Sequence, residues 1–269
     1  MRAANRRRAQ AALAAALAIC ATAAGAAEER LGPGAAPPPA AGEQQRYSGC
    51  LALARKAPKR AHDAALAWRE EGGGDAALHC VALALLGMGK HEAAARQLEA
   101  LSDAVAEGEG RARLRAELLG QAGNAWLIAG RPGAAEAALG RALALAPGNA
   151  ALLVDRGVAL VSQGKFWPAL DDLNRALESE PDRLDALVFR AAAWRGAGSL
   201  ELAEQDADRA IALDPDNFDA LLERGAIRKA MGNEAGARAD WLRVTERAAE
   251  GPLREAARRN LEEMDVKAR

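Results

Sequence analysis

The sequence has few of the side chains that carry enzyme chemistry or hold metal ions. Its 269 residues include three Cys, three His, one Tyr and three Phe. It contains no Walker glycine loop, no H-E-x-x-H zinc motif and no G-x-S-x-G nucleophile motif. Cys50, His79 and Cys80 lack the ligand spacing that is typical of zinc sites. We therefore expect a protein that is not an enzyme and that has no metal, no cofactor and no small-molecule substrate.

An excess of either charge is also missing. The chain has 36 Lys and Arg against 37 Asp and Glu, which gives a net charge of −1. A small basic cluster at Arg111, Arg113 and Arg115 has the pattern of a solvated helix face. Nucleic-acid binding is usually marked by a basic patch or stripe on a basic domain. The charge balance therefore argues against a nucleic-acid partner.

Long apolar runs are absent beyond the start of the chain. Arg2 and Arg6–Arg8 precede an apolar run at Ala9–Cys20, and Ala24-Gly25-Ala26 offers a small-x-small cleavage site. This is the layout of a cleaved secretory signal peptide over residues 1–26. An uncleaved anchor is a weaker alternative because the run is mostly Ala, and a lipid anchor is weaker because Ile19 is large for a lipobox.

Cleavage after residue 26 would leave a mature chain with no apolar stretch long enough to span a membrane. A Pro-, Gly- and Ala-rich segment at residues 27–45 predicts a disordered linker. The heavy use of Arg, Ala and Gly suggests a GC-rich bacterium. The sequence thus predicts an exported, periplasmic protein whose folded part spans residues 46–269.

The chain is rich in one feature, a repetition with a period of 34 residues. Four sets of positions share this period: Pro147, Pro181 and Pro215; Gly130, Gly164, Gly198 and Gly232; Gly123, Gly157, Ala191 and Gly225; and Ala135, Ala169, Ala203 and Ala237. A fixed period of this size indicates a stacked-repeat solenoid, in which each unit buries its apolar face against its neighbours. Such a chain offers a long surface for recognition.

Each repeat has the pattern of two antiparallel helices. In the unit 150–183, apolar residues recur at helical spacing up to Gly164, which is expected to end the first helix in the left-handed conformation. Pro168 is expected at the first position of the second helix. Asn149 and Asn217 are expected to cap the helices that follow them.

The repeat resembles the tetratricopeptide repeat, whose motif runs W-x2-L-G-x2-Y, then A-x3-F, then P. This chain has Leu153-x2-Arg156-Gly157-x2-Leu160, then Ala169-x3-Leu173 and Pro181. The resemblance implies an all-α fold, a right-handed α-solenoid of stacked antiparallel helix pairs.

The chain departs from that motif in three ways. Leu or Trp stands in for several of its aromatic residues, with Trp126 and Trp194 in the Tyr place and Trp241 in the Phe place. Arg156, Arg190 and Arg224 stand where the motif has Leu. Arg228 stands in the Tyr place of the last unit, which suggests an exposed, atypical terminal repeat.

The register divides the folded part into about six units and a cap. Clear units are expected at 116–149, 150–183, 184–217 and 218–251, divergent units at 42–74 and 75–108, and a capping helix at 252–264. Residues 109–115 are an insertion that lengthens either the first helix of the next unit or its preceding loop.

Cys50 and Cys80 remain after removal of the signal peptide. In the repeat register both fall on first helices of adjacent units, which are neighbours in space. In an oxidising compartment they are candidates for a disulfide. The alternative is two buried free thiols, which behave as small apolar groups.

In tetratricopeptide proteins the first helices line the concave face, and the resemblance transfers that face to this chain. The expected partner-binding residues are Asn124, Leu127, Val154, Val158, Val161, Val188, Ala192, Arg195, Leu222, Ala226 and Lys229. They would form an exposed row of Val, Leu and Ala with two cations toward one rim, and exposed apolar surface usually marks a binding site. The alternative is that some of these side chains belong to the core.

These observations predict a non-enzymatic scaffold or adaptor of the bacterial envelope. Its partner would be a peptide or amphipathic helix of another protein, with an acidic group near the cations. Two alternatives stay open, a self-assembling structural protein that forms homo-oligomers and a regulatory partner of an envelope enzyme.

Overall fold

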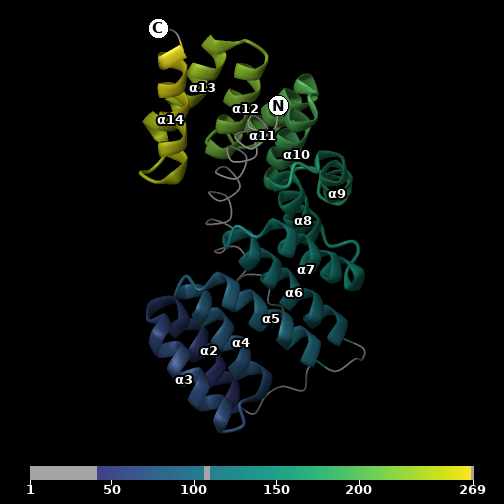
Figure 1. Ribbon diagram of the computed structural model, residues 1–269, viewed down its shortest axis with the longest axis vertical. Coiled ribbons are helices and arrows are strands. Elements are labelled where there is room, and N and C mark those ends of the chain that lie inside the picture. Colours follow the sequence, from purple (N-terminus) through teal and green to yellow (C-terminus); the bar gives the residue numbers. More distant parts are fainter. Residues whose placement is uncertain (1–40, 106–109, 268–269) are drawn as a thin grey trace. The chain divides into compact units, whose positions relative to one another are not determined.

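The computed structural model describes residues 41–105 and 110–267, so the predicted signal peptide and most of the predicted linker lie outside the described residues. Within these ranges every regular element is a helix (Figure 1). The first helices of the repeats are α2 (Ala41–Lys56), α4 (Gly74–Gly87), α6 (Arg111–Ile128), α8 (Ala150–Ser162), α10 (Leu184–Ala197) and α12 (Phe218–Ala230). The second helices are α3 (Pro58–Glu70), α5 (His91–Ala104), α7 (Pro132–Leu145), α9 (Phe166–Ser179), α11 (Leu200–Leu213) and α13 (Glu234–Arg247), and α14 (Pro252–Lys267) follows them.

The chain forms two compact units whose boundary falls within α8. Of the described residues, those up to Asp155 form one unit and those from Arg156 onward form the other. We call them the N-terminal unit and the C-terminal unit. In the N-terminal unit each helix from α2 to α7 contacts the next, and α2 also contacts α4. In the C-terminal unit the same order holds from α9 to α14, and first helices α10 and α12 touch each other. Both units are therefore stacks of helix pairs, as the 34-residue period predicts.

The turns between paired helices are made by glycine, as predicted. Gly130, Gly164, Gly198 and Gly232 have φ angles of 70°, 74°, 90° and 82°. This left-handed conformation is strained for residues with a Cβ atom and open to glycine. The predicted caps are also confirmed, because the side-chain oxygen of Asn149 accepts from the Leu152 N–H at 3.2 Å and that of Asn217 accepts from the Ala220 N–H at 2.9 Å.

Three expected boundaries differ from the structure. Helix α2 begins at Ala41, inside the predicted linker, because Ala, Glu, Gln and Arg at its start are good helix formers. Helix α9 begins at Phe166, so Pro168 is its third residue, a position whose N–H needs no intrahelical partner. Helix α14 runs three residues beyond the predicted end at 264, to Lys267. The insertion at 109–115 lengthens a helix, since α6 begins at Arg111.

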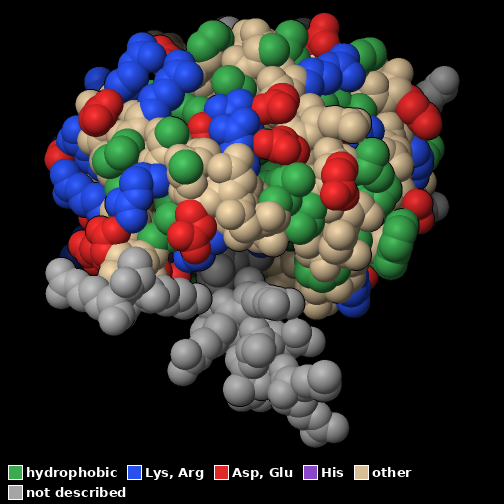
Figure 2. Space-filling model, turned by 90° about the horizontal axis from the view of Figure 1, so that it is seen from above, with side chains coloured by type: hydrophobic (Ala, Val, Ile, Leu, Met, Phe, Trp, Pro, Cys, Tyr) green, Lys and Arg blue, Asp and Glu red, His purple; other side chains and the backbone are tan. Residues whose placement is uncertain are grey.

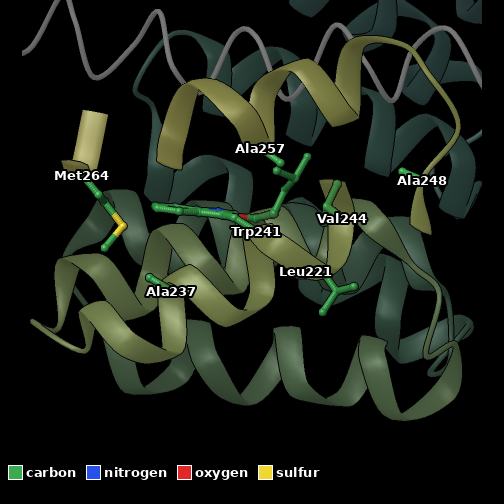
Figure 3. Close-up of a cluster of buried hydrophobic side chains, with 8 residues drawn as sticks. Leu221, Ala237, Trp241, Val244, Ala248, Ala257 and Met264 are labelled. Carbon is green, nitrogen blue, oxygen red and sulfur yellow. The ribbon is translucent and has the colours of Figure 1, made fainter. Parts of the chain in front are cut away.

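The small residues of the repeat allow paired helices to approach closely. A Cβ atom added to Gly123 would lie 2.4 Å from Leu139, and one added to Gly157 would lie 2.9 Å from Leu173. In the last repeat the place of the leucine is taken by Trp241, which would lie 2.3 Å from a Cβ on Gly225. Figure 3 shows the Trp241 ring within a cluster that includes Val244 and, from α14, Ala257. Tryptophan thus fills the space at the end of the C-terminal unit.

Candidate protein-interaction surface

The aliphatic residues expected to line an open groove are buried. Six of them expose between 2% and 7% of their surface: Leu127, Val154, Val158, Val161, Val188 and Leu222. Their spacing placed them on one helix face, and an apolar row is stabilised when it leaves water. Sequence spacing identifies such a face but does not show whether the fold covers it. The prediction of an exposed aliphatic row is therefore wrong, and these side chains are not accessible to a partner in this structure.

Helix α14 accounts for the cover over the last repeat. Leu222 belongs to the Trp241 cluster together with Ala257 of α14, and half-buried Ala226 packs against the same cluster. The Lys229 ammonium lies 5.5 Å from the centre of the Trp241 ring and 3.8 Å from the Glu263 carboxylate of α14. The predicted capping helix thus covers the surface that the last repeat was expected to offer.

The second predicted rim cation is neutralised within the protein. Arg195 on α10 donates to Glu223 on α12 through two hydrogen bonds of 2.6 and 3.2 Å. The negative charge of buried Glu223 raises the pKa of the Arg195 guanidinium. Arg195 therefore joins two successive first helices, and it is not free to meet an acidic group of a ligand. Ala192, one turn earlier on α10, stays partly exposed.

Among the predicted site residues of the N-terminal unit, Asn124 makes a side-chain hydrogen bond to a neighbouring helix. Its side-chain N–H donates to Asp155 at 3.1 Å, from α6 to α8. Gly120, one turn earlier, has no room for a Cβ atom, which would lie 2.7 Å from Leu152. Both residues hold α6 and α8 together.

The residues that depart from the repeat motif form a regular set of ion pairs in the C-terminal unit. Each arginine binds a buried aspartate 16 residues later, on the following second helix, through two hydrogen bonds of 2.6 to 3.0 Å. The pairs are Arg156–Asp172, Arg190–Asp206 and Arg224–Asp240. We call this set the arginine–aspartate ladder. The sequence contains a pattern that indicates the ladder, because the three aspartates share the 34-residue period with the arginines.

The ladder also joins neighbouring repeats. Arg190 donates to Asn174 of the preceding second helix at 2.9 Å, and Arg224 donates to Asp208 at 2.7 Å. A planar guanidinium can hold two partners in one fixed geometry. Arg228, which suggested an exposed and atypical terminal repeat, donates to Glu204 and Asp240 at 2.8 and 3.0 Å. The last repeat is therefore tied into the ladder, because Asp240 draws a second cation inward.

An aromatic residue that the sequence argument left unused is the most exposed large apolar side chain of the described residues. Trp167 on α9 is 64% exposed and meets Trp194 of α10 edge-to-face, with ring centres 6.0 Å apart. Phe166 packs where a Cβ of Gly196 would stand. Trp194 itself packs on buried Ala191, Ala203, Ala207 and Ile227. A rigid platform therefore presents Trp167 to solvent.

Two further exposed apolar residues lie at the same edge of the C-terminal unit. Leu202 is in the first turn of α11 and Met231 follows the end of α12; they are 42% and 41% exposed. Second helices begin and first helices end at one edge of a stack of antiparallel pairs, which places both residues on the edge that carries Trp167. We call Trp167, Leu202 and Met231 the apolar edge. Figure 2 shows basic and acidic side chains mixed with apolar ones over the visible face.

Three titratable groups on first helices have shifted pKa values: His79 and Tyr47 in the N-terminal unit and Asp219 in the last repeat. His79 is buried, and the other two are half-buried. Burial lowers the pKa of His79, whose Nε2 lies 2.8 Å from Gln121 Oε1 of α6 and whose Nδ1 lies 2.5 Å from the Tyr47 hydroxyl of α2. Burial raises the pKa of Tyr47 to about 12. In the last repeat, burial raises the pKa of Asp219 to about 6. Tyr47 and His79 contact only each other among these three groups, and their pKa shifts bear on the pH dependence of stability.

Cys50 and Cys80 are joined as a disulfide between α2 and α4, with Cα atoms 6.2 Å apart. Among the described residues no group of three or more His, Cys, Asp or Glu side chains could hold a metal ion. Within the same ranges, no helix is both long and apolar enough to cross a membrane.

Solved structures with the same architecture come from several bacteria. A tetratricopeptide repeat protein from Parabacteroides merdae is 16% identical, with a TM-score of 0.69 over 82% of this chain and 88% of that chain. TTC0263, a thermophilic TPR protein in Thermus thermophilus, is 18% identical, with a TM-score of 0.57 over 70% and 99%. MamA from Desulfovibrio magneticus RS-1 is 20% identical, with a TM-score of 0.55 over 66% and 97%.

These likenesses and the stacked helix pairs define the class of protein. The chain has the tetratricopeptide repeat fold, an all-α solenoid of the kind that the 34-residue period predicts. No protein-family model and no curated protein matches the sequence.

Proposed function

We propose that this protein is a non-enzymatic interaction scaffold of the bacterial envelope that binds a peptide or amphipathic helix of another protein. The observation that carries the proposal is Trp167, a tryptophan that is 64% exposed on a rigid helix pair. Tryptophan is enriched among the few residues that dominate protein–protein binding energy. A stable soluble fold gains nothing from leaving so large an apolar ring in water.

The apolar edge indicates what kind of partner would fit the surface. Trp167, Leu202 and Met231 come from successive repeats, so they lie in a row along one edge of the C-terminal unit. A partner helix with apolar residues on one face could contact several of them at once. This surface replaces the concave aliphatic row as the proposed contact, because that row is buried.

Export to the periplasm belongs to the same proposal. Its support is the basic start, the apolar run and the small-residue cleavage site of residues 1–26. The Cys50–Cys80 disulfide is consistent with an oxidising compartment, where such bonds form and persist. The N-terminal sequence of the protein recovered from the periplasmic fraction tests this part, and we expect it to begin at Ala27.

Partner capture from envelope extract tests the binding surface. We expect Trp167→Ala to weaken retention of the partner at least tenfold, because truncating a central aromatic contact commonly costs more than about 1.4 kcal/mol of binding energy. Leu213→Ala is the matched control, since Leu213 is 45% exposed at the opposite end of α11 and should leave capture unchanged. Equal capture by all three proteins would place binding away from the apolar edge.

Light scattering over a dilution series separates the scaffold from a self-assembling protein. A partner-binding scaffold should keep the mass of one chain at all concentrations. A mass that rises with concentration and returns to one chain in Trp167→Ala would instead assign the apolar edge to contacts between copies of this protein.

A further inference from the structure

We infer that the Cys50–Cys80 disulfide is a thiol-controlled latch on the first helix, such that reduction by a dithiol releases α2 from the N-terminal unit while α3 to α7 stay folded. The inference rests on how little else holds α2 against the second repeat. It is independent of the apolar edge, which belongs to the C-terminal unit.

Helix α2 buries very little apolar surface. Ala54 is its one buried side chain among those described, and it meets Ala61 and Ala84. Its other inward side chains are only half-buried, namely Tyr47, Cys50, Leu51 and Leu53, whereas Glu43 to Arg46 and Ser48 are exposed. Hydrophobic stabilisation scales with the apolar area removed from water, and an alanine contributes far less area than a leucine. Packing alone therefore holds α2 weakly.

Two polar contacts of α2 reach different parts of the N-terminal unit. Arg46 binds Glu71 at 2.7 Å and lies over the Trp68 ring, so it ties α2 to its own repeat partner α3 and the turn after it. The hydrogen bond between Tyr47 and His79 reaches from α2 to α4 and so joins the two repeats. The disulfide joins the same two helices by a covalent bond. It is thus the strongest link between α2 and the second repeat.

Helix α3 is anchored differently. Its Trp68 is buried, with its ring against Gly73 at the start of α4. Ala65 belongs to a buried cluster with Val81 of α4. Loss of the disulfide leaves these contacts intact, so α2 can leave without its partner helix.

The chemical step is thiol–disulfide exchange. A thiolate of the dithiol attacks the sulfur of Cys50, which is half-buried, whereas Cys80 is fully buried. The Cys50–Cys80 bond breaks, Cys80 leaves as thiolate and takes up a proton, and Cys50 is held as a mixed disulfide. The second thiol of the reductant then displaces Cys50. Two electrons and two protons pass to the protein, and the reductant leaves as a disulfide.

The chain offers its own reporter for the release, because Tyr47 is its single tyrosine. We would follow two quantities in the purified protein before and after reduction with dithiothreitol: hydrogen exchange of each helix by mass spectrometry, and the rate of Tyr47 acetylation by N-acetylimidazole. Reduction should raise α2 exchange and Tyr47 acetylation at least tenfold. Exchange in α3 to α7 should change by less than twofold.

Two variants keep the test decisive. Cys50→Ala with Cys80→Ala should show the released behaviour without any reductant. Tyr47→Phe, which removes the hydrogen bond and keeps the disulfide, should keep α2 protected until dithiothreitol is added. The latch is refuted if α2 stays protected after reduction. It is also refuted if any of α3 to α7 loses protection together with α2, which would mean that the bond stabilises more of the unit than its first helix.

Discussion

The two units place different kinds of side chain at equivalent positions where paired helices pack together. At the ladder position the C-terminal unit places Arg190 against Asp206, whereas the equivalent residues of the N-terminal unit are Ala122 and Ala138, both fully buried. One unit therefore fixes adjacent helices by paired charges, and the other by close contact of small side chains. The difference shows that this repeat motif accommodates either a charged or an apolar pair at these two positions.

Removal of one charge from the arginine–aspartate ladder should give the largest loss of stability among these predictions. Asp206→Ala leaves Arg190 without its main partner, and breaking a buried pair from one side costs about 3–5 kcal/mol. Hydrogen exchange of the C-terminal unit measures the loss. Asp182→Ala, which breaks the exposed Asp182–Arg209 pair, is the control and should have little effect. Recovery of most of the stability in Arg190→Leu with Asp206→Ala would show that the penalty comes from the unpaired charge.

Transfer of the pair to the N-terminal unit tests whether the two solutions are interchangeable. Ala122→Arg with Ala138→Asp should destabilise that unit by at least about 2 kcal/mol, because two fully buried alanines leave no space for longer side chains. Urea unfolding of the protein gives the measurement. Unchanged stability after the transfer would contradict the expectation that the buried alanines leave no space for an arginine–aspartate pair.

Asp219 gives the C-terminal unit an unusual pH dependence. Its folded pKa of about 6 lies above the ordinary value of 3.8, so its contribution to stability is largest below pH 3.8 and falls as the pH rises to about 6. Asp219→Asn should therefore stabilise the C-terminal unit at pH 7.5 by at most about 3 kcal/mol, at 1.36 kcal/mol per pKa unit. The gain should vanish at pH 3.5, as thermal melts at the two values would show.

Glycine substitutions compare the fit of the helix pairs in the two units. Gly123→Ala should cost about 2 kcal/mol, because its Cβ would lie 2.4 Å from Leu139, which is fully buried and cannot move aside. Gly157→Ala has 2.9 Å to Leu173 and should cost less, about 1 kcal/mol. Denaturation midpoints rank the two variants, and the reverse order would mean that the C-terminal unit is the tighter one.

His79 gives the N-terminal unit the opposite response to acid, with the smallest effect. Because its folded pKa is below the ordinary 6.5, its contribution to stability is complete above pH 6.5 and is lost as the pH falls from 6.5 toward the folded value. His79→Gln should make the melting temperature of the N-terminal unit less sensitive to pH between about 7.5 and 5.5, the range in which an ordinary histidine titrates. Unchanged sensitivity would assign the acid response to other groups.

Sequence reasoning predicted local features better than surfaces. The turn glycines and the caps at Asn149 and Asn217 were predictable, because each depends on its own residue and its immediate neighbours in the chain. The binding row at Val158 and Val188 was not, because burial depends on residues far away in sequence. Arg195 and Lys229 were expected to be free, and each has an acidic partner 28 or more residues away.

By itself the sequence determined the repeat, its period, its turns and the class of fold, since these follow from backbone preferences and from apolar spacing that recurs every 34 residues. The tertiary structure alone decided that the aliphatic row is covered and that Trp167 stays in water, and it showed that the periodic arginines and aspartates are paired. The physical reason is that exposure and charge pairing are properties of distances between helices, whereas spacing along the chain fixes only which residues share a face.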